Sequence, residues 1–200
     1  MSRAFVIVDA QNDFTEGGAL AVAGATAAYQ KTGRYLAEVP DDFYTHLVTT
    51  QDWHVNPGSH FAEQPDYTDT WPAHCVAGEP GAEINPVMAD NIAAFRQAHR
   101  DIKLIAVKKG EFEAAYSGFE GVSDNGTVLT NALKAGGVTD LDIVGVATDH
   151  CVRATALDAL KEGYRVRVFP AQTAAVDADR GEAALAEIAA AGGEIVREEN

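Results

Sequence analysis

The sequence is short of cysteine, aromatic residues and positive charge. It has 200 residues with two cysteines, Cys75 and Cys151, so one disulfide is possible on count alone. Two isolated cysteines in a chain of this size are more typical of a reducing compartment. Lys and Arg total 15 against 30 Asp and Glu, which gives a formal net charge of -15. Such a chain repels phosphate backbones, and we expect no nucleic acid partner.

Long hydrophobic runs and the features of a signal peptide are also absent. The apolar run at residues 4–8 is too short to cross a bilayer, and no small-residue cleavage site follows it. We therefore expect a cytoplasmic protein without a membrane partner. A hydrophobic content of 46% and the chain length suit one α/β domain spanning residues 1–200.

Short apolar segments rich in β-branched residues alternate with segments of helical periodicity. The predicted strands lie at residues 4–8, 46–50, 104–107, the start of 141–160, 165–169 and 194–197, with Pro170 ending the fifth. The predicted helices lie at 24–38, 87–97, 127–135, the second half of 141–160, and 179–191. This alternation predicts a doubly wound, mainly parallel sheet in the order 3-2-1-4-5-6 with helices on both faces.

The stretch at residues 141–160 organises the chain, because Cys151 falls where a strand gives way to a helix. Thr148 or Asp149 can cap that helix. A helix N-terminus stabilises a nearby thiolate, and the surrounding backbone N–H groups can form an oxyanion hole. The alternative is a buried structural cysteine, which is the commoner fate of a lone Cys.

Polar residues follow the predicted strands at one edge of the sheet. Asp9 follows the first strand, Asp52 the second, Lys109 the third and Cys151 the fourth. Asp9 can take the thiol proton and later activate water, and Lys109 can lower the thiol pKa and restrain the carboxylate. The alternative is a capping aspartate, a surface lysine and a core thiol. Convergence of the three on one edge favours catalysis.

A second group of polar residues has the composition of a metal site. Asp52 and His54 project to the same side of a strand, and His60 and His74 lie in the long aperiodic loop at about 52–86. Carboxylate and imidazole ligands suit zinc, iron or manganese without deciding between them. The alternative is a set of ordinary loop histidines. Cys75 is either a further ligand or a buried thiol, and we favour the thiol.

Three aromatic residues, Phe14, Trp71 and Tyr116, lie in loops that leave the same sheet edge. Flat side chains in this place can sandwich a flat aromatic substrate, but from spacing alone we favour the alternative, which is loop packing. His150 adjoins the nucleophile, and we expect it to shape the pocket rather than to act as the base.

Several motifs together resemble the nicotinamidase/pyrazinamidase family, within the isochorismatase-like cysteine hydrolases. They occur in the order of that family and span nearly the whole chain. They are Val-Asp-Ala-Gln-Asn-Asp-Phe at 8–14, Gln-Asp-Trp-His at 51–54, Pro-Gly-Ser-His at 57–60, Trp-Pro-Ala-His-Cys at 71–75, Lys-Gly at 109–110, Ala-Tyr-Ser-Gly-Phe-Glu-Gly at 115–121 and Gly-Val-Ala-Thr-Asp-His-Cys-Val at 145–152.

The resemblance implies an activity, a cofactor and partners. The activity is hydrolysis of nicotinamide to nicotinate and ammonia through a thioester, with pyrazinamide as a further substrate, in NAD salvage. The cofactor is one divalent metal ion, zinc, iron or manganese. The partner is the small-molecule substrate nicotinamide, and the protein is a monomer or a homo-oligomer.

The resemblance also implies roles for individual residues. Cys151 resembles the nucleophile, Asp9 the base and Lys109 the third member of the triad. The N–H groups of Ala147 and Cys151 match the oxyanion hole, and Val146–Ala147 matches a cis peptide. The remaining matches are the metal ligands Asp52, His54 and His74, an extra ligand His60, and the substrate-pocket residues Phe14, Trp71, Tyr116, Val146 and His150.

Three other functions compete with this one. A related amidohydrolase acting on a carbamoyl or ureido substrate would share the triad but lack the cluster of Asp52, His54 and His74. An isochorismatase would lack a nucleophilic cysteine. A non-catalytic metal-binding module would explain the histidines but would leave the convergence of Asp9, Lys109 and Cys151 a coincidence.

Overall fold

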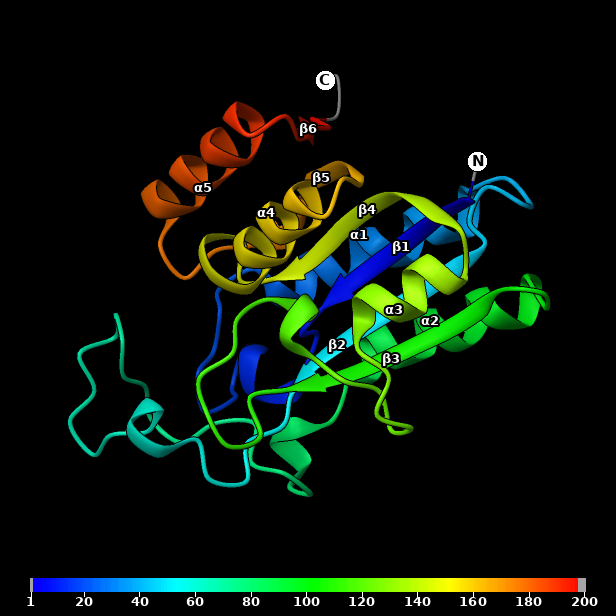
Figure 1. The fold of residues 1–200 in the computed structure, drawn as a ribbon. Helices are drawn as coiled ribbons and strands as arrows, with labels where there is room; N and C mark the ends of the chain where they lie inside the picture. The colour runs from blue at the N-terminus through cyan, green and yellow to red at the C-terminus, as the bar shows by residue number, and fades with distance from the viewer. Residues whose placement is uncertain (1, 198–200) are drawn as a thin grey trace.

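A computed structural model describes residues 2–197 and contains one six-stranded parallel sheet in the order β3-β2-β1-β4-β5-β6 (Figure 1). The predicted fold class and strand order are confirmed. The strands are β1 (Ser2–Val8), β2 (His46–Asp52), β3 (Lys103–Lys109), β4 (Val138–Val146), β5 (Arg165–Ala174) and β6 (Glu194–Ile195).

Helices cover both faces of the sheet, which explains the continuous apolar runs of the strands. On one face, Phe5 and Ile7 of β1 pack in a cluster with residues of α1 (Ala25–Glu38) and α2 (Pro86–Ala98). On the other face, Val6 and Val8 join a cluster with residues of α3 (Leu129–Ala135), α4 (Arg153–Lys161) and α5 (Ala178–Ala190). Alternate residues of β1 therefore serve two separate cores.

Strand β5 is longer than its sequence predicts, because it continues past Pro170 to Ala174. Its pairing with β4 jumps from Ile143↔Val168 to Gly145↔Thr173, so extra residues of β5 bulge out between the two pairs. Proline is tolerated at a bulge because the strand makes no ladder hydrogen bond there. The predicted end of this strand at Pro170 was therefore wrong. The predicted sixth strand shortens to Glu194–Ile195.

The turn after β4 also differs from its prediction. Residues Thr148–Val152 form one turn of π-helix, and α4 begins only at Arg153. Neither Thr148 nor Asp149 caps this turn. The Thr148 hydroxyl donates to Thr173 Oγ1 instead, and the Asp149 carboxylate accepts from backbone N–H groups of another loop. The expected side-chain cap was therefore wrong, because both candidate side chains bond to residues near the end of β5.

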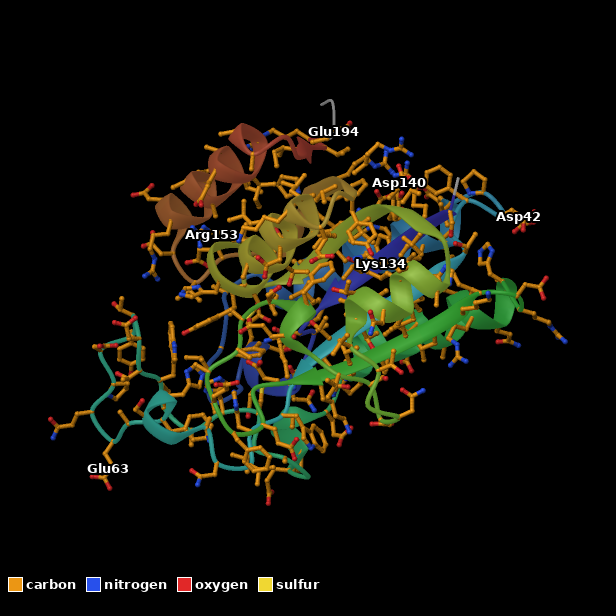
Figure 2. All side chains as sticks on the ribbon, viewed as in Figure 1. Asp42, Glu63, Lys134, Asp140, Arg153 and Glu194 are labelled. Carbon is orange, nitrogen blue, oxygen red and sulfur yellow. The ribbon has the colours of Figure 1, made fainter. Side chains whose placement is uncertain are left out.

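The long aperiodic segment after β2 lies beyond the carboxyl ends of the strands, where it projects from the body of the molecule (Figure 1). It contains only short 3-10 turns, Gly58–His60 and Pro80–Ala82, before α2 begins. Figure 2 shows Glu63 pointing outward from this segment. None of the helices in residues 2–197 has the length and apolar character that a membrane crossing requires.

Candidate active site

Four side chains converge where the first four strands end. Asp9 follows β1, Asp52 and Lys109 end β2 and β3, and Cys151 lies just after β4. The Nζ atom of Lys109 lies 2.9 Å from Asp9 Oδ2 and donates to Asp52 Oδ1 and, at 3.6 Å, to Cys151 Sγ. The structure thus brings together the carboxylate, the amine and the thiol that were predicted from distant parts of the sequence.

The backbone conformation at Asp9 directs its side chain toward this cluster. Asp9 has a φ of 46°, in the left-handed region that a strand residue does not use, so the chain leaves β1 here. The Asp9 N–H donates to Thr50 O, and Thr50 Oγ1 donates to Asp9 Oδ1 at 2.6 Å. Gly145 permits β4 to approach, because a Cβ atom there would lie 2.1 Å from Val8 O. Neighbouring strands therefore hold Asp9 and Cys151 close together.

Lys109 and Asp52 form a buried ion pair. Burial lowers the pKa of Lys109, but the carboxylates of Asp52 and Asp9 outweigh it and hold that pKa well above its usual range. Burial raises the pKa of Asp52, but Lys109 and the neighbouring imidazoles His54 and His74 hold it well below its usual range. Both groups are therefore charged at neutral pH, and Lys109 is a permanent cation beside the thiol.

Burial raises the pKa of both Cys151 and Asp9. Burial raises the pKa of Cys151 well above that of a free thiol, and Lys109 only partly offsets it because Asp9 and Asp52 repel a thiolate. Burial also raises the pKa of Asp9, against the attraction of Lys109. The expected effect of Lys109 is present, because its positive charge lowers the pKa of the thiol, but burial and the two carboxylates outweigh it. A thiol with a raised pKa therefore lies beside a carboxyl group that its surroundings make more basic.

The predicted metal ligands form a second cluster that shares Asp52 with the first. The rings of His54, His60 and His74 have centroids 5.0 to 5.4 Å apart, and a nitrogen from each lies within 4.8 Å of the others. Asp52 Oδ2 lies 3.7 Å from His54 Nε2 and 3.8 Å from His74 Nε2. Cys75 takes no part in this histidine cluster and is a buried free thiol.

The donor set of this cluster fits a divalent metal ion. His54 Nδ1 donates to Gly110 O at 2.6 Å and His74 Nδ1 donates to Pro72 O at 2.8 Å, which leaves both Nε2 atoms as acceptors. His54 Nε2 is buried without a hydrogen-bond partner. Separations of 3.7 to 3.8 Å are too long for hydrogen bonds but suit ligands of one ion with bonds of about 2.0–2.2 Å.

His60 completes the cluster from the loop side. Burial and the neighbouring imidazoles lower the pKa of His60 to about 4, so its ring is neutral at pH 7. Its Nδ1 atom is buried without a partner. A neutral imidazole with a free lone pair is the form that binds a metal, and His60 fits the role of an additional ligand.

A cavity opens beside both clusters. Its lining includes Cys151, His60 and His74, and also the predicted pocket residues Phe14, Trp71, Tyr116 and His150. Trp71 Nε1 donates to the Tyr116 hydroxyl at 3.1 Å, which fixes the two rings relative to each other. Val146 does not line the cavity. Its side chain is fully buried in the core beneath it, and its peptide bond to Ala147 is cis.

Residues 3–200 match the family model of the isochorismatase domain. The chain is 48% identical over 194 residues to a nicotinamidase/pyrazinamidase of Mycobacterium tuberculosis, covering 97% of this chain and 98% of that protein. The chain belongs to the isochorismatase family. The resemblance inferred from the motifs is confirmed.

Solved structures of family members share the fold. The pyrazinamidase of Pyrococcus horikoshii in complex with zinc is 34% identical with a TM-score of 0.76, covering 99% of this chain and 100% of that one. The PnC1 protein from L. infantum in complex with nicotinate is 31% identical with a TM-score of 0.79, covering 98% of this chain and 92% of that one.

Sequence reasoning missed several residues of this family member's site. Leu20, Val22 and Val176 also line the cavity, but none belongs to a polar motif that would have marked it. Gln11 is fully buried, and its side-chain amide bonds to both the N–H and the C=O of Asp52. Its place inside the motif at 8–14 could have indicated this role. A glutamine side-chain amide carries both a donor and an acceptor, so it can bond to a strand residue as the backbone of a neighbouring strand does.

Proposed function

We propose that this protein is a metal-dependent cysteine amidohydrolase that converts nicotinamide to nicotinate and ammonia, and pyrazinamide to pyrazinoate. One observation carries the proposal, namely that Asp9, Lys109 and Cys151 meet at a cavity beside a buried cluster of imidazoles. The 48% identical relative named nicotinamidase/pyrazinamidase supports the choice of substrate.

The first half of the proposed reaction forms a thioester. Asp9 takes the proton of the Cys151 thiol, and the sulfur attacks the carboxamide carbon of the substrate. Negative charge moves to the carboxamide oxygen, within reach of the N–H groups of Ala147 and Cys151, both residues of the cavity wall. The C–N bond then breaks, and protonated Asp9 delivers its proton to the departing ammonia.

The second half regenerates the thiol. Asp9, again a carboxylate, takes a proton from water as the oxygen of that water attacks the thioester carbon. The C–S bond breaks, Cys151 recovers the proton held by Asp9, and the product leaves as nicotinic acid, which loses its proton to solvent and becomes nicotinate. The raised pKa of Asp9 favours both transfers, because it makes the carboxylate a stronger base. Lys109 stays an ammonium throughout and offsets the negative charge of Asp9, Asp52 and the transient thiolate.

Asp52, His54 and His74, with His60 as an additional ligand, would hold the metal ion of the proposed enzyme. When bound, a divalent ion supplies a Lewis acid that accepts a lone pair from the pyridine nitrogen and fixes the ring. The zinc-containing pyrazinamidase structure supports zinc as the first ion to test. The aromatic side chains of Phe14, Trp71 and Tyr116 would enclose the flat ring.

Two rival functions make different demands on this site. An amidohydrolase for a carbamoyl or ureido substrate has no ring nitrogen to bind, so it would not need His54, His60 and His74 clustered at the cavity. A non-catalytic metal module would not need Lys109 buried between two carboxylates and a thiol. Burying that charge costs desolvation free energy, and metal binding alone gives no reason for it. Both features together favour the amidase.

The decisive experiment measures ammonia release from nicotinamide by protein of known metal content. The wild type should release ammonia and nicotinate in equal amounts. Cys151→Ala should release none while keeping its metal, and Cys75→Ala serves as the matched control because Cys75 is a buried thiol outside the cavity. Activity retained in Cys151→Ala, or a metal-loaded wild type that leaves nicotinamide intact, would refute the proposal.

A further inference from the structure

Asp149 is a buried carboxylate that none of the proposed chemical steps uses. It lies two residues before Cys151 in the π-helix Thr148–Val152, and its side chain is only 2% exposed. Its Oδ1 accepts from the Val176 N–H at 2.9 Å and its Oδ2 accepts from the Asp177 N–H at 3.2 Å. Arg180 Nε lies 3.4 Å from Oδ2. One side chain thus ties the turn of the nucleophile to the loop between β5 and α5.

The groups that Asp149 holds belong to the cavity wall. Val176 lines the cavity and is 43% exposed, which places it at the rim rather than in the core. His150 also lines the cavity, and its Nδ1 lies 3.2 Å from Asp149 Oδ1. The His150 ring packs edge-on against Trp71 at a centroid distance of 5.2 Å. Asp149 therefore contacts two residues of the cavity wall, namely the backbone of Val176 and the ring of His150.

The character of these contacts favours a carboxylate over any neutral side chain. Two backbone N–H groups donate to the two oxygens, and the His150 imidazole and the Arg180 guanidinium lie 3.2 and 3.4 Å from them. Hydrogen bonds to a charged acceptor are about twice as strong as those between neutral groups. Val176 is half-exposed, so its position depends more on the backbone bond to Asp149 than the position of a fully buried residue would.

We infer that Asp149 is a positioning residue that sets the cavity rim through Val176 and His150, and that Val176 determines which ring substituents the site admits. This inference rests on the proposed function, because it assumes that a pyridine carboxamide occupies the cavity. Asp149 touches neither the reacting carbon nor the sulfur, so it governs binding rather than the chemical steps.

The first test is Asp149→Asn, which keeps the side-chain volume but replaces one acceptor oxygen by an NH₂ group. We expect KM for nicotinamide to rise about tenfold while kcat stays within about threefold, because one backbone N–H loses its acceptor. The same change in a Cys151→Ala background should weaken equilibrium binding of nicotinamide about tenfold. That measurement needs no turnover, so it separates this inference from the proposed function.

Asp177→Ala is the matched control. Asp177 lies in the same loop and caps α5 by accepting from the Arg180 N–H at 2.9 Å, but it is not among the residues that line the cavity. Its loss should lower the melting temperature without moving KM. If Asp149→Asn lowers the melting temperature in the same way and leaves KM and nicotinamide binding unchanged, Asp149 is merely structural and the inference is wrong.

The second test concerns selectivity. Val176→Ala should raise kcat/KM for a ring-methylated nicotinamide relative to nicotinamide by about tenfold, the usual range for one methyl group in an apolar pocket. Asp149→Asn should raise this ratio of kcat/KM values as well. In the double variant the change in free energy of selectivity should be smaller than the sum of the two single changes, because both substitutions affect the same part of the cavity wall. Additive effects, or an unchanged ratio in Val176→Ala, would overturn the assignment.

Discussion

Asp52 connects the cluster of Asp9, Lys109 and Cys151 to the histidine cluster. One oxygen of its carboxylate accepts from Lys109 Nζ, and the other faces the Nε2 atoms of His54 and His74. A single side chain thus neutralises the cation beside the thiol and offers a ligand atom to a metal ion. Losing the carboxylate and losing an imidazole should therefore have different consequences.

Asp52→Asn should reduce metal content and lower kcat by at least about 100-fold, because Lys109 loses one of its two carboxylate partners. The thiol of this variant should be alkylated faster by iodoacetamide, since removing a negative neighbour lowers the pKa of Cys151. His74→Ala should lose metal as well but should alkylate at the wild-type rate to within about twofold. Equal alkylation rates in the two variants would show that Asp52 does not influence the thiol.

The bond from Thr50 to Asp9 should appear in the pH dependence of activity. In the proposed reaction Asp9 acts as a base, so kcat/KM should rise with pH through the pKa of Asp9, which burial raises above 3.8. The Thr50 hydroxyl bonds to the carboxylate form and lowers that pKa. In Thr50→Val the acid limb should therefore move to higher pH, with kcat/KM at the optimum reduced about 3- to 10-fold.

Thr49→Val makes the same chemical change one residue away on β2, where side chains alternate between the faces of the sheet. Its pH profile should match that of the wild type. An unshifted acid limb in Thr50→Val would mean that the limb reports a group other than Asp9.

Gln11 should be important for both stability and activity. Its amide bonds to both backbone groups of Asp52 and to Ala82 O, so Gln11→Ala leaves buried polar groups without partners. We expect the free energy of unfolding to fall by about 2–4 kcal/mol, together with weaker metal retention. Gln51→Ala is the control, because Gln51 donates to the same Ala82 carbonyl but does not bond to Asp52. Equal losses in both variants would contradict a specific role for Gln11.

Asp140 should contribute stability without affecting catalysis. It lies near the start of β4, at the end of the sheet opposite to the candidate site (Figure 2). Its carboxylate accepts from Arg165 Nε and Nη2 at 2.8 and 2.7 Å, and these bonds lower its pKa to about 2. A folded-state pKa below the unfolded value gives stability that is present above pH 4 and lost as the pH falls toward 2.

Asp140→Asn should therefore lower the free energy of unfolding at pH 7 by about 1–2 kcal/mol, less than a fully buried pair because Arg165 is largely exposed. The difference from the wild type should shrink in urea titrations as the pH approaches 2, and kcat for nicotinamide should not change. A constant difference at all pH values would assign the effect to packing rather than to charge.

Much of the fold could be predicted because its signals are local. Buried strands are continuous apolar runs, and parallel connections follow one handedness, so the order of strands and the shared edge of Asp9, Asp52, Lys109 and Cys151 followed from the sequence. The proximity of these side chains is observed, whereas their chemical roles stay predictions. Strand β5 was misjudged at Pro170 because a bulge arises from pairing with β4, which no local pattern reveals.

The sequence by itself determined which residues leave the sheet at one edge, since periodicity and glycine or proline placement act over a few residues. Only the tertiary structure decided how those residues share charge. Burial raises the pKa of the thiol above what a helix terminus and a lysine alone would give. Packing also places one oxygen of Asp52 against Lys109 and the other against two imidazoles. Solvation and distances of a few ångströms govern these effects, and both exist only once distant segments have packed together.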